Sequence, residues 1–250
     1  MDISLSHRQF GGTYLFKGRY VKSALSLSLM CLAVLLTGCV TAPQTPVALS
    51  PQAFVAPTNN YGVVMTDLPV MDTQFPGAGC LLCLAAASIG NSSLTAHAKT
   101  LPYEDLPKLN EQVAAVLRAK GAKATVIQKL DLKALPDNSK AAPDFARKDF
   151  TSLKAKYNID KLLVVNISTL ALERSYAAYI PNSDPKAHIA GAAYIVNLSD
   201  NKLEWYAPIE VSKASDGKWD EPPKFPGLTN AYYQSLELAK DQVIKPLSVK

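Results

Sequence analysis

The chain has few of the side chains from which metal centres and nucleophilic catalysts are built. It contains four Cys and three His in 250 residues, and only Cys80 and Cys83 follow residue 39 among the cysteines. A structural zinc site needs four ligands, and neither His97 nor His188 stands at a recognised ligand spacing from these two cysteines. We therefore predict no metal site.

The motifs of common enzyme classes are also missing. The sequence has no G-x-S-x-G elbow, no H-E-x-x-H pair and no P-loop, and Gly77-Ala78-Gly79 lacks the third glycine of a dinucleotide fingerprint. Paired acids such as Asp220-Glu221 are typical of solvated surface, because carboxylates are seldom buried. We therefore expect a protein that is not an enzyme and holds no cofactor apart from covalent lipid.

The positive charge is concentrated near the N-terminus. The whole chain carries 26 Lys+Arg against 21 Asp+Glu, a formal net charge of +5. Four of the basic residues and only one acid precede Cys39, which leaves a net charge of +2 for the rest. This distribution argues against a general nucleic-acid-binding surface, because such a surface needs an excess of basic residues in the folded part. The hydrophobic content of 48% is enough to build the core of one ordinary domain.

The N-terminal segment is typical of an export signal. Residues 24–36 carry no charge, and their length fits the apolar region of a signal peptide but falls short of the roughly 20 residues that cross a bilayer. Leu36-Thr37-Gly38-Cys39 follows and resembles the bacterial lipobox. The resemblance implies removal of residues 1–38 and attachment of diacylglycerol and an N-acyl chain such as palmitate to Cys39. Val40 in place of Asp implies the outer membrane, with the protein facing the periplasm.

The segments on either side of the lipobox suggest two further hypotheses. The part before the apolar run is long for a signal peptide, and a start at Val21 would make it compact, so we hypothesise that translation begins there instead of at Met1. Residues 40–57 contain four prolines and no charge. Such a segment favours extended backbone, so residues 39–60 are predicted to form a tether.

Hydrophobic periodicity predicts one domain over residues 61–250, of α/β (α+β) class. We expect strands at residues 61–66, 122–128, 161–172, 189–198 and 203–211, and helices at 104–120, 144–157 and 229–245. The order β-α-β-α-β-β-β-α predicts a single mixed sheet with packed helices. Pro208 cannot donate to a ladder, which predicts that the strand at 203–211 lies at an edge.

The lipobox, the tether and this element order together resemble a group of outer-membrane lipoproteins. The group includes the curli secretion subunit and the lipoprotein activators of penicillin-binding proteins. The resemblance implies an α/β lipoprotein domain in the periplasm. The lipobox is its one sharp motif, so Cys39 is the one functional residue that it implies.

Cys80 and Cys83 leave three alternatives. Cα atoms at i and i+3 lie about 5–6 Å apart in a helix, which allows a disulfide, and about 10 Å apart in a strand, which does not. The neighbours Leu81 and Leu82 are apolar, and no cation is near to lower a thiol pKa. We therefore favour an inert buried pair over a structural disulfide, and a disulfide over a thiol-disulfide oxidoreductase.

The uncharged run at residues 80–89 is a candidate contact surface. Its length suits one pore-forming strand, but the alternation of apolar and polar residues is missing. We expect the start of a buried helix or a subunit interface. If the run is exposed, it marks a binding site for a partner.

A second candidate surface is the Pro-rich loop at residues 216–228. Trp219 and Phe225 on a stiff backbone suit partner binding, because rigid aromatics lose little entropy on association. The alternative is that both side chains fold back over the sheet.

These observations predict a binding or assembly accessory factor of a cell-envelope complex. Its partners would be the membrane, through the lipid, and an unidentified envelope protein, with self-association and no nucleic acid. The alternative functions are an oligomeric ring or pore subunit for secretion, and a thiol-disulfide oxidoreductase that uses Cys80 and Cys83.

Overall fold

The computed structural model describes residues 43–54, 60–140 and 142–248. The predicted signal peptide, the hypothesised start at Val21 and the lipidation site Cys39 lie outside these residues. The chain divides into two units, Met1–Pro43 and Gln44–Lys250. All helices and strands described below belong to the second unit.

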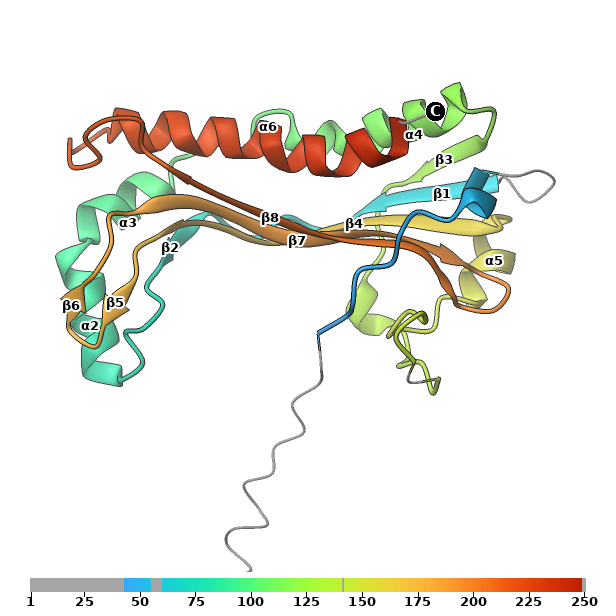
Figure 1. Ribbon diagram of the computed structural model, residues 1–250, viewed down its shortest axis with the longest axis horizontal. Helices are drawn as coiled ribbons and strands as arrows, with labels where there is room; N and C mark the ends of the chain where they lie inside the picture. Colours follow the sequence, from blue (N-terminus) through green and yellow to red (C-terminus); the bar gives the residue numbers. More distant parts are fainter. Residues whose placement is uncertain (1–42, 55–59, 141, 249–250) are drawn as a thin grey trace, which may run out of the picture. The chain divides into compact units, whose positions relative to one another are not determined.

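A mixed sheet of six strands forms the centre of this unit (Figure 1). Its strands run in the order β3-β1-β4-β7-β8, and β2 pairs with β4 beyond the end of β1. β4 is parallel to β1 and β2 but antiparallel to β7, and β8 closes the edge as the second arm of a hairpin. The strands are β1 (Asn60–Met65), β2 (Asp72–Gln74), β3 (Lys123–Ile127), β4 (Lys161–Glu173), β7 (Lys186–Asn197) and β8 (Leu203–Ala214). The predicted mixed α/β class is confirmed, and Pro208 does lie on an edge strand.

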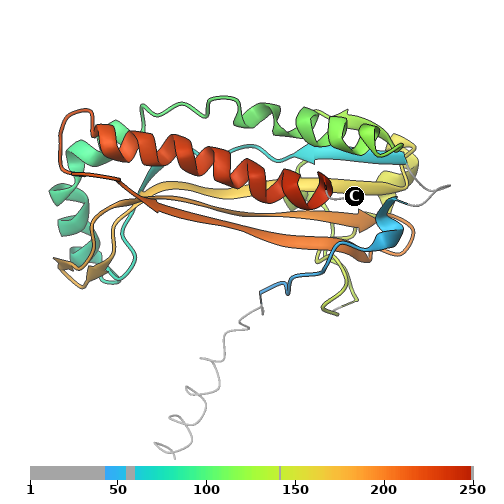
Figure 2. The ribbon, with the colours of Figure 1, turned by 45° about the horizontal axis from the view of Figure 1, so that its top comes forward.

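Helices α4 (Leu109–Ala119) and α6 (Pro226–Ser248) cover one face of the sheet, as Figure 2 shows in green and red. The main core lies between this face and the two helices, because the apolar stripe of α4 packs on β3 and β1 and that of α6 packs on β7 and β8. Fully buried members include Val63, Leu163, Val113, Leu117, Tyr232 and Val243. Within the described residues, the structure contains no helix with the length and apolar character needed to span a membrane.

The opposite face of the sheet is covered at one end by α5 (Ser152–Tyr157) and the segment before it, which includes the 3-10 turn η3 (Leu132–Ala134). The predicted helix at residues 144–157 begins only at Ser152. The preceding backbone is held by distant partners instead: Leu203 N–H donates to Asp144 O (2.8 Å), and Phe150 N–H donates to the side chain of Asn201 (2.9 Å). Long-range hydrogen bonds therefore replace the first turns of the helix.

The predicted tether is partly incorporated into the domain. Val47 forms an antiparallel bridge with Tyr206, and Ser50 N–H donates to Glu204 O (2.8 Å). Ala53, in the 3-10 turn η1 (Pro51–Phe54), is fully buried. The edge of β8 offers backbone groups that pair with any extended segment nearby. The boundary predicted at residue 61 is therefore wrong, and the folded unit begins at Gln44.

The other end of the domain contains the remaining elements. Helices α2 (Leu81–Gly90) and α3 (Ser92–Ala98) follow β2, and a 3-10 turn, η2 (Leu106–Lys108), precedes α4. A two-stranded ribbon, β5 (Tyr176–Ala177) with β6 (Ile180–Pro181), lies beside α2 (Figure 1). The run at residues 80–89 is thus helical, as predicted, and not a strand.

Candidate functional site

Most of the large hydrophobic side chains that the described residues expose gather on α2 and the β5–β6 ribbon. Leu81, Ile89 and Leu82 are 85%, 76% and 70% exposed. Tyr179 and Ile180 on the ribbon are also more than half exposed. We call α2, its N-cap Cys80 and the ribbon from Tyr176 to Pro181 the apolar tip. The run at residues 80–89 is therefore not the start of a buried helix, because only Cys83 and Ala87 of α2 face inward.

A small separate core holds α2 against the ribbon. The ring of Phe75 meets the ring of Tyr176 edge-on, with centroids 5.8 Å apart. The buried side-chain amide of Asn91 donates to the Tyr176 hydroxyl (2.6 Å) and to Ala87 O (2.7 Å), and Arg174 donates to its oxygen (3.1 Å). The buried members of this core are Ala78, Cys83, Ala87 and Tyr176. The buried side of the tip is thus held by this small core, while its outer surface stays exposed.

The tip carries no formal charge. Residues 73–98 and 175–183 contain no Asp, Glu, Lys or Arg. The charged residues that border these two segments are Asp72, Lys99, Arg174 and Asp184, and the half-exposed Asp72 lies 3.5 Å from Lys99. A contiguous exposed surface without charge marks a contact site for a protein or a membrane.

Cys80 and Cys83 are joined by a disulfide at the start of α2. Cys80 is the N-cap of the helix, and its Sγ accepts a hydrogen bond from the Cys83 N–H (2.9 Å). Cys83 is 3% exposed, whereas Cys80, which precedes the first turn of the helix, is exposed. The structure thus contains the disulfide that was the second alternative. The favoured alternative, an inert pair of buried cysteines, is wrong because Cys80 is exposed.

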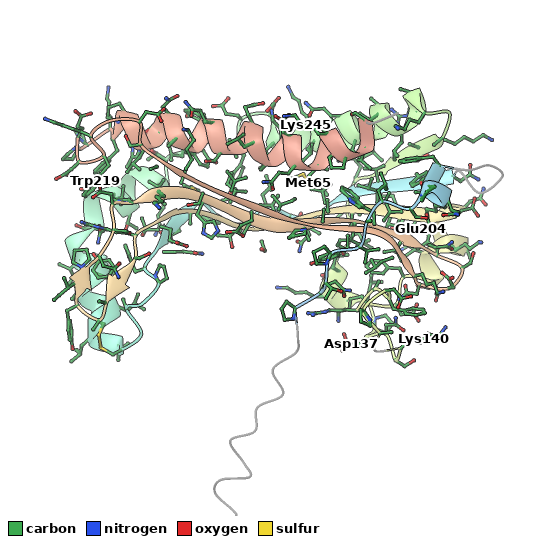
Figure 3. The ribbon with its side chains drawn as sticks, in the orientation of Figure 1. Met65, Asp137, Lys140, Glu204, Trp219 and Lys245 are labelled. Carbon is green, nitrogen blue, oxygen red and sulfur yellow. A yellow bond between two sulfur atoms is a disulfide. The ribbon has the colours of Figure 1, made fainter. Side chains whose placement is uncertain are left out.

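The two aromatic candidates of the loop at residues 216–228 fold back onto the domain. Phe225 is 2% exposed and lies in the main core, with its ring 5.5 Å from that of His97. Trp219, labelled in Figure 3, is partly buried, and the guanidinium of Arg174 lies 4.7 Å from its ring centroid. Phe225 is therefore not available as a partner-binding residue, because α6 begins at the next residue and draws it into the core.

Both histidines of the described residues, His97 and His188, have structural partners. Nε2 of His97 lies 2.7 Å from Oγ1 of Thr229, and burial lowers the pKa of this imidazole. Nδ1 of His188 lies 2.7 Å from Glu173 Oε2, and its Nε2 lies 2.8 Å from Glu210 Oε1. The group of His188, Glu173 and Glu210 could not be predicted from the sequence, since β4, β7 and β8 bring together residues that are far apart in the chain. No cluster of three or more side chains suited to a metal occurs in the part of the chain that the structure describes.

A cavity on the face opposite α6 is a weaker candidate site. Tyr194 and Tyr206 stack in its lining, with centroids 5.8 Å apart, and burial raises the pKa of Tyr194. Its volume of about 170 Å³ is small beside the roughly 300–1,000 Å³ of small-molecule sites. The apolar tip is therefore the leading candidate.

Comparisons with known proteins find similar solved structures, but with low TM-scores. No protein-family model matches the chain, and no curated protein sequence matches it. The PelC dodecamer from Paraburkholderia phytofirmans aligns at 12% identity over 84% of this chain and 95% of that chain, with a TM-score of 0.33. Protein XCC0632 from Xanthomonas campestris aligns at 13% identity over 79% and 89%, with a TM-score of 0.34. Lipoprotein GNA1162 from Neisseria meningitidis aligns at 12% identity over 71% and 98%, with a TM-score of 0.25. All three TM-scores are below 0.5, so these similarities carry no argument about what this chain binds.

Proposed function

We propose that the protein is a lipid-anchored lipoprotein of the bacterial outer membrane that faces the periplasm and acts without catalysis. It works as a binding or assembly accessory factor in the cell envelope and docks through the apolar tip. The observation that carries this proposal is the gathering of exposed, uncharged, apolar side chains on α2 and the β5–β6 ribbon. Exposed apolar surface of this kind marks contact sites.

The anchor is supported by the sequence around Cys39. The uncharged run at residues 24–36 ends directly in Leu-Thr-Gly-Cys, which is the required place for a lipobox. The thiol of Cys39 would form a thioether to diacylglycerol, and its freed amino group would be acylated.

The anchor is tested by the mass of the N-terminal peptide of the purified mature protein. A peptide that begins at Cys39 and carries three acyl chains is expected. In a Cys39→Ala variant, no lipidated peptide should form. An unmodified N-terminus at any other residue would refute the anchor.

The docking surface is tested by photo-cross-linking in intact cells. A diazirine amino acid at position 82 should form adducts, because Leu82 lies on the tip. The matched control carries the same group at position 238, since Leu238 is an exposed leucine of α6 on the other face of the sheet. Adducts at both positions or at neither would contradict docking through the tip.

A second candidate function, thiol-disulfide exchange, is favoured by one observation. The disulfide lies at the N-terminus of α2, with Cys80 exposed and Cys83 buried. A helix N-terminus stabilises a thiolate, and an exposed sulfur is open to attack by an external thiolate. Attack on Cys80 Sγ would form a mixed disulfide and release the Cys83 thiolate.

This second candidate predicts a trapped intermediate. A Cys83→Ser variant leaves Cys80 as the single thiol of the tip, and it should form mixed disulfides with periplasmic proteins in living cells. The reciprocal Cys80→Ser variant, whose remaining thiol is buried, is the control. If both variants form mixed disulfides equally, or if neither forms any, the disulfide has a structural role only.

A further inference from the structure

We propose that the occupant of the apolar tip is the lipid surface in which Cys39 is anchored. The proposal rests on the lipid anchor of the proposed function and deepens it, because it names the membrane as the surface on which the apolar tip docks. It makes the protein a two-point membrane binder, held by acyl chains at one point and by α2 with its ribbon at the other.

The first argument is the short distance between the anchor and the folded unit. Gln44 is the fifth residue after Cys39, and an extended chain advances at most about 3.3–3.6 Å per residue, so the connection reaches about 17 Å. Gln44 itself is fixed, since its side-chain amide donates to Pro143 O, and Val47 pairs with Tyr206. The anchored lipid therefore holds one face of the domain close to the membrane.

The second argument is that the tip lies on that same face. In Figures 1 and 2 the segment that begins at residue 44 leaves the domain on the side of the sheet away from α6. Helix α2 and the β5–β6 ribbon project from this side as well, at the other end of the sheet. A short connection that brings this face to a bilayer therefore also presents the tip to it.

The third argument is the chemistry of the tip. Insertion into the boundary between headgroups and acyl chains is costly for ions, and residues 73–98 and 175–183 contain none of the four charged residue types. Tyr179 is 55% exposed, its hydroxyl lies 3.6 Å from Sγ of Cys80, and an amphipathic ring of this kind suits the membrane interface.

The outer surface of α6 gives an internal contrast. Leu238 is 45% exposed, but charged residues surround it in the sequence, with Glu237 beside it and Asp241 paired to Lys245 at 2.8 Å. It also lies on the helix that covers the opposite face of the sheet. Exposed leucine thus occurs both in the proposed membrane contact and on a surface away from it.

The test measures contact of each position with lipid. The full mature protein, lipidated at Cys39, is reconstituted into vesicles of phosphatidylethanolamine and phosphatidylglycerol with and without brominated phosphatidylcholine. Two variants, Leu82→Trp and Leu238→Trp, share the native background of Trp205 and Trp219. Bromine should quench the added Trp at position 82 by at least about twofold and leave the one at 238 unchanged. Matching thermal unfolding of both variants shows that each is folded.

Three results would overturn the proposal. Equal quenching at both positions would indicate no preferred face, and absence of quenching at both would mean that the tip does not reach lipid. If bromine does not quench Leu82→Trp but its emission shifts to the blue as the protein concentration rises, the tip would instead contact a second copy of the chain. Loss of the lipid from the Cys39 peptide, measured on the same samples, would instead refute the proposed function itself.

Discussion

Nζ of Lys161 lies 2.8 Å from Oε2 of Glu204, in an ion pair whose side chains are only 2% and 12% exposed. Lys161 begins β4, and Glu204, which Figure 3 labels, lies on β8 two strands away. The same Nζ donates to Gln52 O (2.8 Å) and Ala53 O (3.0 Å), so the ammonium joins the sheet to the segment before β1. This pair explains why the Pro-rich segment is part of the folded unit.

Replacement of Lys161 by Met should destabilise the protein strongly. It leaves the carboxylate of Glu204 buried without its partner and removes two hydrogen bonds to η1, at a cost of about 3–5 kcal/mol in the free energy of unfolding. Urea unfolding measures the loss. A Lys161→Met, Glu204→Leu double variant should recover most of it, and a double variant as unstable as the single one would show that the pair itself matters little.

Gly191 should not tolerate a methyl group. It lies opposite Ile167 at the irregularity between β4 and β7, and a Cβ there would sit 2.1 Å from Asn166 O, a backbone atom that cannot move aside. Gly191→Ala is expected to cost about 1–3 kcal/mol through this overlap. Gly79→Ala is the matched control, since a Cβ at Gly79 meets nothing within 4 Å. Equal unfolding midpoints for the two variants would contradict the expectation.

His97 should make stability depend on pH. Burial lowers its pKa below the ordinary value of 6.5, so the unfolded chain binds a proton at a higher pH than the folded protein does. The stability contributed by the neutral ring is present above about pH 6.5 and is lost as the pH falls toward the lower folded-state pKa. The difference in unfolding free energy between about pH 8 and about pH 5 should shrink in His97→Gln, which cannot titrate. An unchanged difference would exclude His97 as its source.

The leucines of the tip should contribute little to folding. Leu82→Ser changes an exposed side chain and should alter the free energy of unfolding by no more than about 0.5 kcal/mol. Leu94→Ala, in α3 and 1% exposed, should cost about 2–5 kcal/mol. Chemical denaturation compares the two. A large loss in Leu82→Ser would mean that the tip is folding core instead of contact surface.

The regular part of the fold could be predicted because its elements bury one face each. In β8 the apolar side chains alternate as Leu203, Trp205, Ile209 and Val211, and α4 repeats leucine and valine at helical spacing. These periods follow from backbone geometry alone, so the predicted positions of the long strands and of α6 agree with the structure within a few residues. The disulfide was among the alternatives because a helical spacing of i and i+3 permits it.

The candidate site was predicted only in part because exposure is not a local property. The run at residues 80–89 is as apolar as a core helix, and nothing in it shows that only Cys83 and Ala87 meet a partner. Phe225 presents the reverse case, since it resembles a surface anchor but is drawn into the core at the start of α6.

The sequence by itself determined the class of the fold and the positions of its long strands, because the period of the apolar residues is written along the chain, and it predicted the lipobox at Cys39. The tertiary structure decided which apolar residues are covered, where the folded unit begins, and that Lys161 meets Glu204. These depend on contacts between residues far apart in the chain, and the energy of such contacts exists only once the sheet has formed.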